Sequence, residues 1–142
     1  MSATSTGVRE VLLLDTDLCL AILKGDRGVL SHLQDDPDPV AICFATVGEL
    51  FAAAYTSTAA LRNNQLVQEF LLTTPVVESN NDIAARFGRL RNQGSPGSQG
   101  SPDRSDTTLY IAAAALSNDA TLLTGRPEAF QGIPELKLHI YR

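Results

Sequence analysis

Two carboxylates separated by a single residue follow an apolar run near the N-terminus. In VLLLDTDLCLAIL, residues 11–23, Asp15 and Asp17 flank Thr16, and the next basic residue along the chain is Lys24. Like charges this close repel, so each carboxyl group resists ionising beside the other. A carboxylate at the end of a strand that is buried on both faces also needs a strong partner. The stretch therefore predicts that Asp15 serves a site.

Two more acids are expected at the same edge of a sheet. Glu49 follows an apolar run at residues 40–45, and Asp106 opens a helix that precedes a strand at residues 121–124. Ligands bind in open α/β sheets outside the carboxyl ends of the strands. Carboxylates gathered there repel unless a divalent cation holds them, and oxygen ligands suit Mg²⁺ or Mn²⁺. Such an ion activates water for attack on a phosphodiester. We therefore predict a metal site formed by Asp15, Glu49 and Asp106.

Each acid also has an ordinary structural interpretation. Asp17 is a candidate cap for the first helix, and Glu49 completes a T-x-x-E capping box. Asp106 and Ser105 are both candidate N-caps for the helix after residue 105. Asp15 is the hardest to explain in this way, because it ends a buried strand. The prediction of a metal site thus depends on the convergence of the three acids.

Apolar runs and turn residues predict the elements that position these side chains. Continuous apolar runs are typical of strands covered on both faces, and the strict alternation of LKLHIY predicts a final edge strand. Strands and helices alternate, which is typical of a three-layer α/β/α sandwich with a mainly parallel sheet of four to five strands. The expected strands span residues 11–14, 40–45, 75–77, 121–124 and 136–141, and the expected helices 18–24, 28–34, 47–55, 58–72, 81–93 and 106–118.

Length and composition limit the classes of protein to consider. The 142 residues, 44% of them hydrophobic, suit one domain over residues 1–142 with a substantial core. The Gly-, Ser- and Pro-rich segment at 94–105 predicts a flexible loop too short to separate two domains. No apolar run has the length of a membrane span or a signal peptide, so we expect a cytoplasmic protein without a membrane contact. The net charge of −5 argues mildly against a nucleic-acid partner without excluding one.

Three stretches resemble the motifs of PIN-domain ribonucleases. LLLDTDLCLAILKGD resembles their opening motif, usually written LLDTNILIYLLKGD, and VAICFATVGELFAAA is similar to the second motif, with its acid at Glu49. LYIAAAALSNDATLLTGRPEAF is similar to the third motif, and GIPELKLHIY to the usual ending. The resemblance covers nearly the whole chain and is strongest to the VapC toxins of bacterial toxin–antitoxin pairs.

The resemblance implies a parallel sheet flanked by helices, a Mg²⁺ or Mn²⁺ site and cleavage of RNA. It further implies a homodimer and an antitoxin partner that covers the site. On this basis Asp15, Glu49 and Asp106 would hold the metal and orient the attacking water. Asp17 would be an outer ligand, and the Thr16 hydroxyl would hold Asp15 by a hydrogen bond.

Three positions depart from the family pattern, and the first is Asp17, where the opening motif has Asn. Counting back from LYIAAAAL places the third family acid at Thr108, so Asp106, or Asp103 as a substitute, would have to take its role. The fourth acidic or Asn position falls at Arg126, and an arginine there would weaken a cation site or replace part of its charge. The alternative function is therefore a PIN-like domain that has lost catalysis and binds RNA or a protein.

Arginines offer candidate contacts to an RNA backbone. Arg86, Arg89 and Arg91 lie on the helix before the Gly/Ser/Pro-rich loop, and Arg126 lies beside the expected acids. A solvated helix face explains the first three better. From the repulsion in the acid pair we also predict that Asp15→Asn abolishes cleavage but stabilises the metal-free protein.

Overall fold

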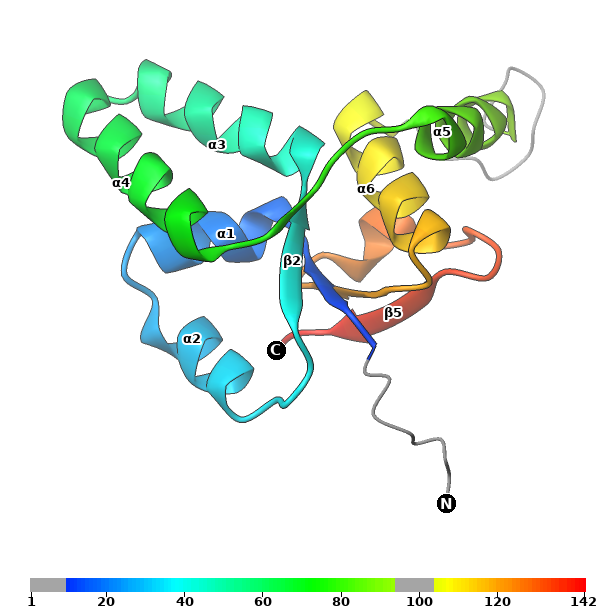
Figure 1. Cartoon of the computed structure of the whole chain (residues 1–142), viewed down its shortest axis with the longest axis horizontal. Helices are drawn as coiled ribbons and strands as arrows, with labels where there is room; N and C mark the ends of the chain where they lie inside the picture. Colours follow the sequence, from blue (N-terminus) through cyan, green and yellow to red (C-terminus); the bar gives the residue numbers. More distant parts are fainter. Residues whose placement is uncertain (1–9, 94–103) are drawn as a thin grey trace.

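A five-stranded parallel sheet forms the centre of the protein (Figure 1). The computed structural model describes residues 10–93 and 104–142. The strand order is β3-β2-β1-β4-β5, and every neighbouring pair is parallel. The strands are β1 (Leu12–Leu14), β2 (Val40–Cys43), β3 (Val76–Val77), β4 (Thr121–Thr124) and β5 (Lys137–Ile140). β1 thus lies between β2 and β4, as the convergence of the acids requires, and β5 is an edge strand as predicted.

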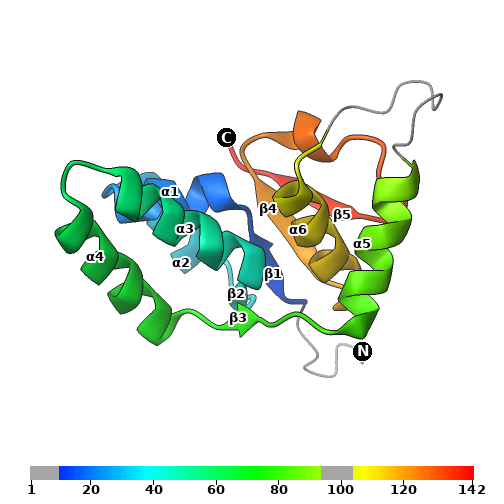
Figure 2. The ribbon, with the colours of Figure 1, turned by 90° about the horizontal axis from the view of Figure 1, so that it is seen from above.

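Helices cover both faces of the sheet (Figure 2). They are α1 (Thr16–Leu23), α2 (Arg27–Gln34), α3 (Phe44–Thr56), α4 (Ala60–Thr73), α5 (Asn81–Gln93) and α6 (Asp106–Ser117), with a 3₁₀ turn η1 (Pro127–Phe130) after β4. α5 and α6 pack on one face, and α1 to α4 on the other. The expected three-layer α/β/α sandwich is confirmed.

Alternate residues of each strand supply the two halves of the core. Leu13 and Leu122 face α5 and α6, whereas Leu12, Leu14 and Leu123 face α1 to α4. All five side chains are buried. Because a strand covered on both faces has no solvent side, it needs the continuous apolar runs that the sequence shows. Each fully buried leucine contributes about 1.5–3 kcal/mol of burial free energy.

Two predicted helix starts are wrong, and tertiary packing explains both. α3 begins at Phe44, directly after β2, so the capping box that starts at Thr46 does not form. Thr46 instead lies buried inside the helix, where its hydroxyl bonds that of Thr16. α1 begins at Thr16 with Asp15, and not Asp17, as its N-cap. Both helices follow their strands without a connecting loop, which holds the strand ends rigidly.

The remaining predicted elements agree with the structure to within a few residues. Ser105 is the N-cap of α6, one of the two candidates for that role. The predicted flexible loop at 94–105 lies mostly outside the described residues, which resume at Arg104. Among the helices of the described segments, none combines the length and hydrophobicity needed to cross a membrane.

Candidate functional site: an arginine on the central aspartate

Asp15 lies fully buried at the carboxyl end of the central strand. It follows β1 directly, and its backbone N–H donates to the carbonyl of Leu123 in β4. The exposed fraction of Asp15 is 0%. A charged carboxylate so far from water costs several kcal/mol unless other groups satisfy it. The surroundings of Asp15 therefore decide what the site can do.

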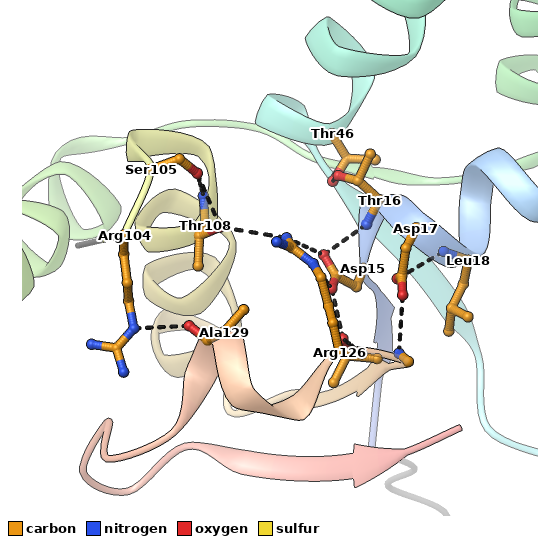
Figure 3. Close-up of polar contacts among 12 residues, drawn as sticks. Asp15, Thr16, Asp17, Leu18, Thr46, Arg104, Ser105, Thr108, Arg126 and Ala129 are labelled. Carbon is orange, nitrogen blue, oxygen red and sulfur yellow. Dashed lines mark hydrogen bonds and ion pairs between the residues drawn. The ribbon is translucent and has the colours of Figure 1, made fainter. Parts of the chain in front are cut away.

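Four hydrogen bonds satisfy the two carboxylate oxygens of Asp15 (Figure 3). Oδ1 accepts from the backbone N–H of Thr16 at 2.8 Å and from Nη2 of Arg126 at 3.1 Å. Oδ2 accepts from the Thr124 hydroxyl at 2.6 Å and from Nε of Arg126 at 2.8 Å. Arg126 thus holds both oxygens with its planar fork, the strongest geometry for an arginine–carboxylate pair.

Several contacts set the position of Arg126. Its backbone N–H donates to the Thr124 hydroxyl at 3.0 Å, directly after β4 ends. The guanidinium carbon lies 5.5 Å from the ring centroid of the buried Phe130, within the range of a cation–π contact. The hydrogen bond to Asp15 raises the pKa of Arg126 above its ordinary value, and the charges of Asp17 and Glu49 raise it further. Arg126 is therefore a permanent cation in this site.

The position expected to hold the third acid carries a threonine that also contacts Arg126. The Thr108 hydroxyl accepts from Nη2 of Arg126 at 3.4 Å, a long hydrogen bond. It lies 3.0 Å from the hydroxyl of Ser105, which also accepts from the Thr108 backbone N–H. Thr108 is buried near the start of α6. The guanidinium thus bonds α6 and the end of β1, while the backbone N–H of Arg126 bonds the end of β4 (Figure 3).

Asp17 holds the backbone that leads into Arg126. Its Oδ1 accepts from the N–H of Leu18, and its Oδ2 accepts from the N–H of Gly125 at 3.2 Å. A Cβ at residue 125 would lie 2.9 Å from that same oxygen, so the contact requires a glycine. Burial and the charge of Asp15 together raise the pKa of Asp17 above its ordinary value. Asp17 therefore connects the start of α1 to the turn after β4.

Glu49 in α3 is another acid with a buried carboxylate oxygen. Its Oε1 is buried and has no hydrogen-bond partner within the described part of the chain. The charge of Glu49 also contributes to the raised pKa of Arg126. The three acids Asp15, Asp17 and Glu49 thus carry more negative charge than Arg126 alone can neutralise.

Asp106 does not join the site. Its Oδ1 accepts from Nη2 of Arg91 at 2.6 Å, and its side chain is 73% exposed at the start of α6. The described residues hold no group of three His, Cys, Asp or Glu side chains able to bind one metal ion. The predicted convergence of Asp15, Glu49 and Asp106 is therefore not observed. Asp103, the predicted substitute, lies outside the described residues.

Other predicted contacts also differ from the structure. The Thr16 hydroxyl bonds Thr46 at 3.0 Å and not Asp15, which is held by the Thr16 backbone N–H instead. Of the arginines proposed for RNA, Arg86 pairs with Asp82 and Arg91 with Asp106. Arg89 lies exposed on α5.

The donor set of this site does not suit Mg²⁺ or Mn²⁺. These ions take hard oxygen ligands in near-octahedral geometry. Both oxygens of Asp15 already accept bonds from Arg126, and Thr108 offers a neutral hydroxyl where a third carboxylate would stand. A guanidinium that faces the central carboxylate repels a divalent cation at the same place.

Sequence reasoning missed three residues of the site. Thr124 donates to Asp15, Thr46 bonds Thr16, and Gly125 contacts Asp17. Thr124 ends β4 beside the end of β1, so the rule for strand ends in parallel sheets could have found it. No sequence signal marks Thr46, which pattern analysis assigned to a helix cap.

The comparisons with solved structures define the fold. VapBC2 from Rickettsia felis, solved bound to a promoter DNA fragment, has a TM-score of 0.83 at 22% identity over 93% of this chain and 99% of that chain. DNA-bound VapBC from Salmonella typhimurium has a TM-score of 0.81 at 22% identity over 94% and 98%. VapBC-1 from nontypeable Haemophilus influenzae has a TM-score of 0.78 at 24% identity over 92% and 97%.

These similarities show that the chain has a PIN fold of the VapC type. The predicted fold class is thereby confirmed. Neither a scan against protein-family models nor a search of curated proteins found a match.

Proposed function

We propose that this chain is a PIN-fold, protein-binding module of the toxin–antitoxin type that does not cleave RNA by metal catalysis. The observation that carries the proposal is the two-bond pair between Arg126 and Asp15. Metal-dependent hydrolysis needs carboxylates free to hold the cation that activates water. In this site the central carboxylate is held by an arginine, and the third acid is replaced by Thr108.

A groove on the opposite side of the sheet from α5 and α6 supports a protein partner. It lies between α1, α3 and α4 and has a volume of about 290 Å³. Leu20, Leu23, Leu50 and Leu66 line it, so it suits apolar side chains. On the same two helices α3 and α4, Tyr55 and Leu61 are exposed by 67% and 82%. An apolar groove, with exposed apolar side chains on the helices that form it, is compatible with a protein-binding surface.

The expected occupant is a short apolar segment of an antitoxin-type protein. Several neighbours in fold were solved as toxin–antitoxin assemblies, and the Klebsiella pneumoniae neighbour carries that description directly. RNA is less well supported as the ligand, because the net charge is −5 and the arginines Arg86, Arg91 and Arg126 already pair with acids. A homodimer remains a prediction.

An RNA cleavage assay tests the catalytic part of the proposal. The wild-type protein and Asp15→Ala are incubated separately with a mixture of structured and single-stranded RNAs in the presence of Mn²⁺. We expect no difference in cleavage rate between them. Metal-dependent cleavage by wild type that disappears in Asp15→Ala would establish the ribonuclease instead, the function favoured by the retained Asp15 and by the unpartnered oxygen of Glu49.

A co-expression experiment tests the binding part. The chain is expressed alone and with the product of any short reading frame found directly upstream of its gene, and the complex is measured by size exclusion with light scattering, which also reports a homodimer. Ala53→Arg places a bulky charge in the groove, whereas Ala52→Arg, on the same helix and outside the groove lining, is the matched control. We expect loss of the complex only with Ala53→Arg. Equal binding by both variants would place the partner elsewhere.

A further inference from the structure

Arg126 contacts the ends of three elements, β1, α6 and β4. Its guanidinium bonds Asp15 after β1 and Thr108 in α6, and its backbone N–H bonds Thr124 at the end of β4. We propose that Arg126 takes the place of a divalent cation: it neutralises the buried Asp15 and joins these three elements without a metal. This inference deepens the proposed function, because it explains how a site without a metal ion remains folded.

Arg126 neutralises the charge of the buried Asp15. Asp15 has no exposed surface, and its two oxygens accept four hydrogen bonds, two of them from Arg126. Guanidinium carries its charge at every physiological pH, so the neutralisation does not depend on an ion from solution. The Arg126 side chain is 35% exposed, which leaves part of its charge hydrated and lowers its own burial cost.

Thr108 stands where the family pattern has an acid, and this replacement suits the arginine. A carboxylate at this position would compete with Asp15 for the same Nη2 atom, which bonds Oδ1 of Asp15 at 3.1 Å and Thr108 at 3.4 Å. One guanidinium would then face two buried acids, and like charges in a buried site disfavour each other. Threonine supplies an acceptor without a charge. Thr108 and Arg126 are therefore matched, so that changing both together should recreate a cation site.

The experiment compares wild type with the double variant Arg126→Asn, Thr108→Asp. Melting temperature is measured in chelator and with added Mn²⁺, and Mn²⁺ binding is measured directly by the loss of the free-ion signal in electron paramagnetic resonance. A triple variant that adds Asp15→Ala is the control for binding at this site.

We expect chelator and Mn²⁺ to leave the melting temperature of wild type unchanged. The double variant should melt below wild type in chelator because its acids are unpaired. At Mn²⁺ about a hundredfold above the dissociation constant, its melting temperature should rise by roughly 5–10 °C. The triple variant should lose this rise. The result that overturns the inference is a Mn²⁺-dependent rise in wild type that Asp15→Ala removes, or a folded double variant that does not bind Mn²⁺.

A second variant keeps the inference testable if the double variant does not fold. Arg126→Lys retains the charge but loses the planar fork, so we expect a lower melting temperature that Mn²⁺ does not change. A lysine variant as stable as wild type would show that the two-bond geometry of the Arg126 guanidinium does not contribute to stability. These experiments measure stability and metal binding, so their results can contradict the inference while the RNA and partner assays still support the proposed function. The RNA and partner assays can likewise contradict the proposed function while the stability and metal-binding results support the inference.

Discussion

Two arginine–aspartate pairs in this protein have similar closest distances and different surroundings. Arg126 and Asp15 approach to 2.8 Å, and Arg91 and Asp106 approach to 2.6 Å. The Asp15 side chain is 0% exposed, whereas that of Asp106 is 73% exposed. Distance alone would rank the exposed pair first. Burial reverses that order, because the same charges interact more strongly where water is excluded.

The difference between the pairs shows why one aspartate defines a site and the other does not. Water and salt screen the exposed pair, and ordering two long side chains offsets much of its attraction. At Asp15 no water replaces a lost partner, so removal of either member leaves an uncompensated charge. Asp106 also lies in the first turn of α6, where a carboxylate is favoured by the helix dipole whether or not it has a partner.

The largest effect is expected at the buried pair. Asp15→Asn should lower the free energy of unfolding by about 3 kcal/mol, the lower end of the range for breaking a buried pair, because Arg126 is partly exposed. This is the opposite of the sequence-based expectation, which considered only repulsion between the acids. Urea denaturation measures the change. A variant more stable than wild type would show that repulsion outweighs the pairing with Arg126.

A smaller effect is expected at the exposed pair. Arg91→Gln removes the same type of cation from Asp106, together with a hydrogen bond to the carbonyl of Arg104. We expect a loss of less than about 1 kcal/mol. The same urea titration, repeated at high salt, gives the test. A loss comparable to that of Asp15→Asn would mean that burial does not separate the two pairs.

The smallest effect is expected at Asp17, and its sign depends on pH. Burial and the nearby Asp15 raise the pKa of Asp17 above 3.8, so ionisation of this group costs the folded state free energy. The cost is absent below the unfolded pKa and appears as the pH rises through the raised folded pKa.

Asp17→Asn removes this ionisation. Asn can accept only one of the two backbone bonds that Asp17 accepts from Leu18 and Gly125, which is a loss independent of pH. Relative to wild type, the stability of the variant should therefore rise as the pH increases from about 3 to about 7, by less than about 1 kcal/mol. Urea titrations across this range measure the difference between the two proteins, so that other titrating groups cancel. A difference that stays constant with pH, or that falls as the pH rises, would contradict the expectation.

The sequence predicted most of the fold because the local spacing of apolar residues indicates where the strands and helices lie. Continuous apolar runs at 11–14 and 40–45 indicated strands covered on both faces, and turn residues separated the helices. The same patterns could not predict the start of α3. The T-x-x-E box does not form because α3 begins at Phe44, directly after β2, so that Thr46 lies inside the helix with its hydroxyl bonded to that of Thr16.

The candidate site was likewise predicted only in part from the sequence. The residue types and the strand ends were enough to identify Asp15 as the central acid, whereas the resemblance to PIN-domain ribonucleases identified Thr108 and Arg126 as positions where acids were expected. Only the tertiary structure decided that Arg126 bonds Asp15 and that Asp106 faces Arg91. Sequence specifies which charges exist, but their energies depend on burial and on which opposite charge lies nearest, and both are set by how the three layers pack.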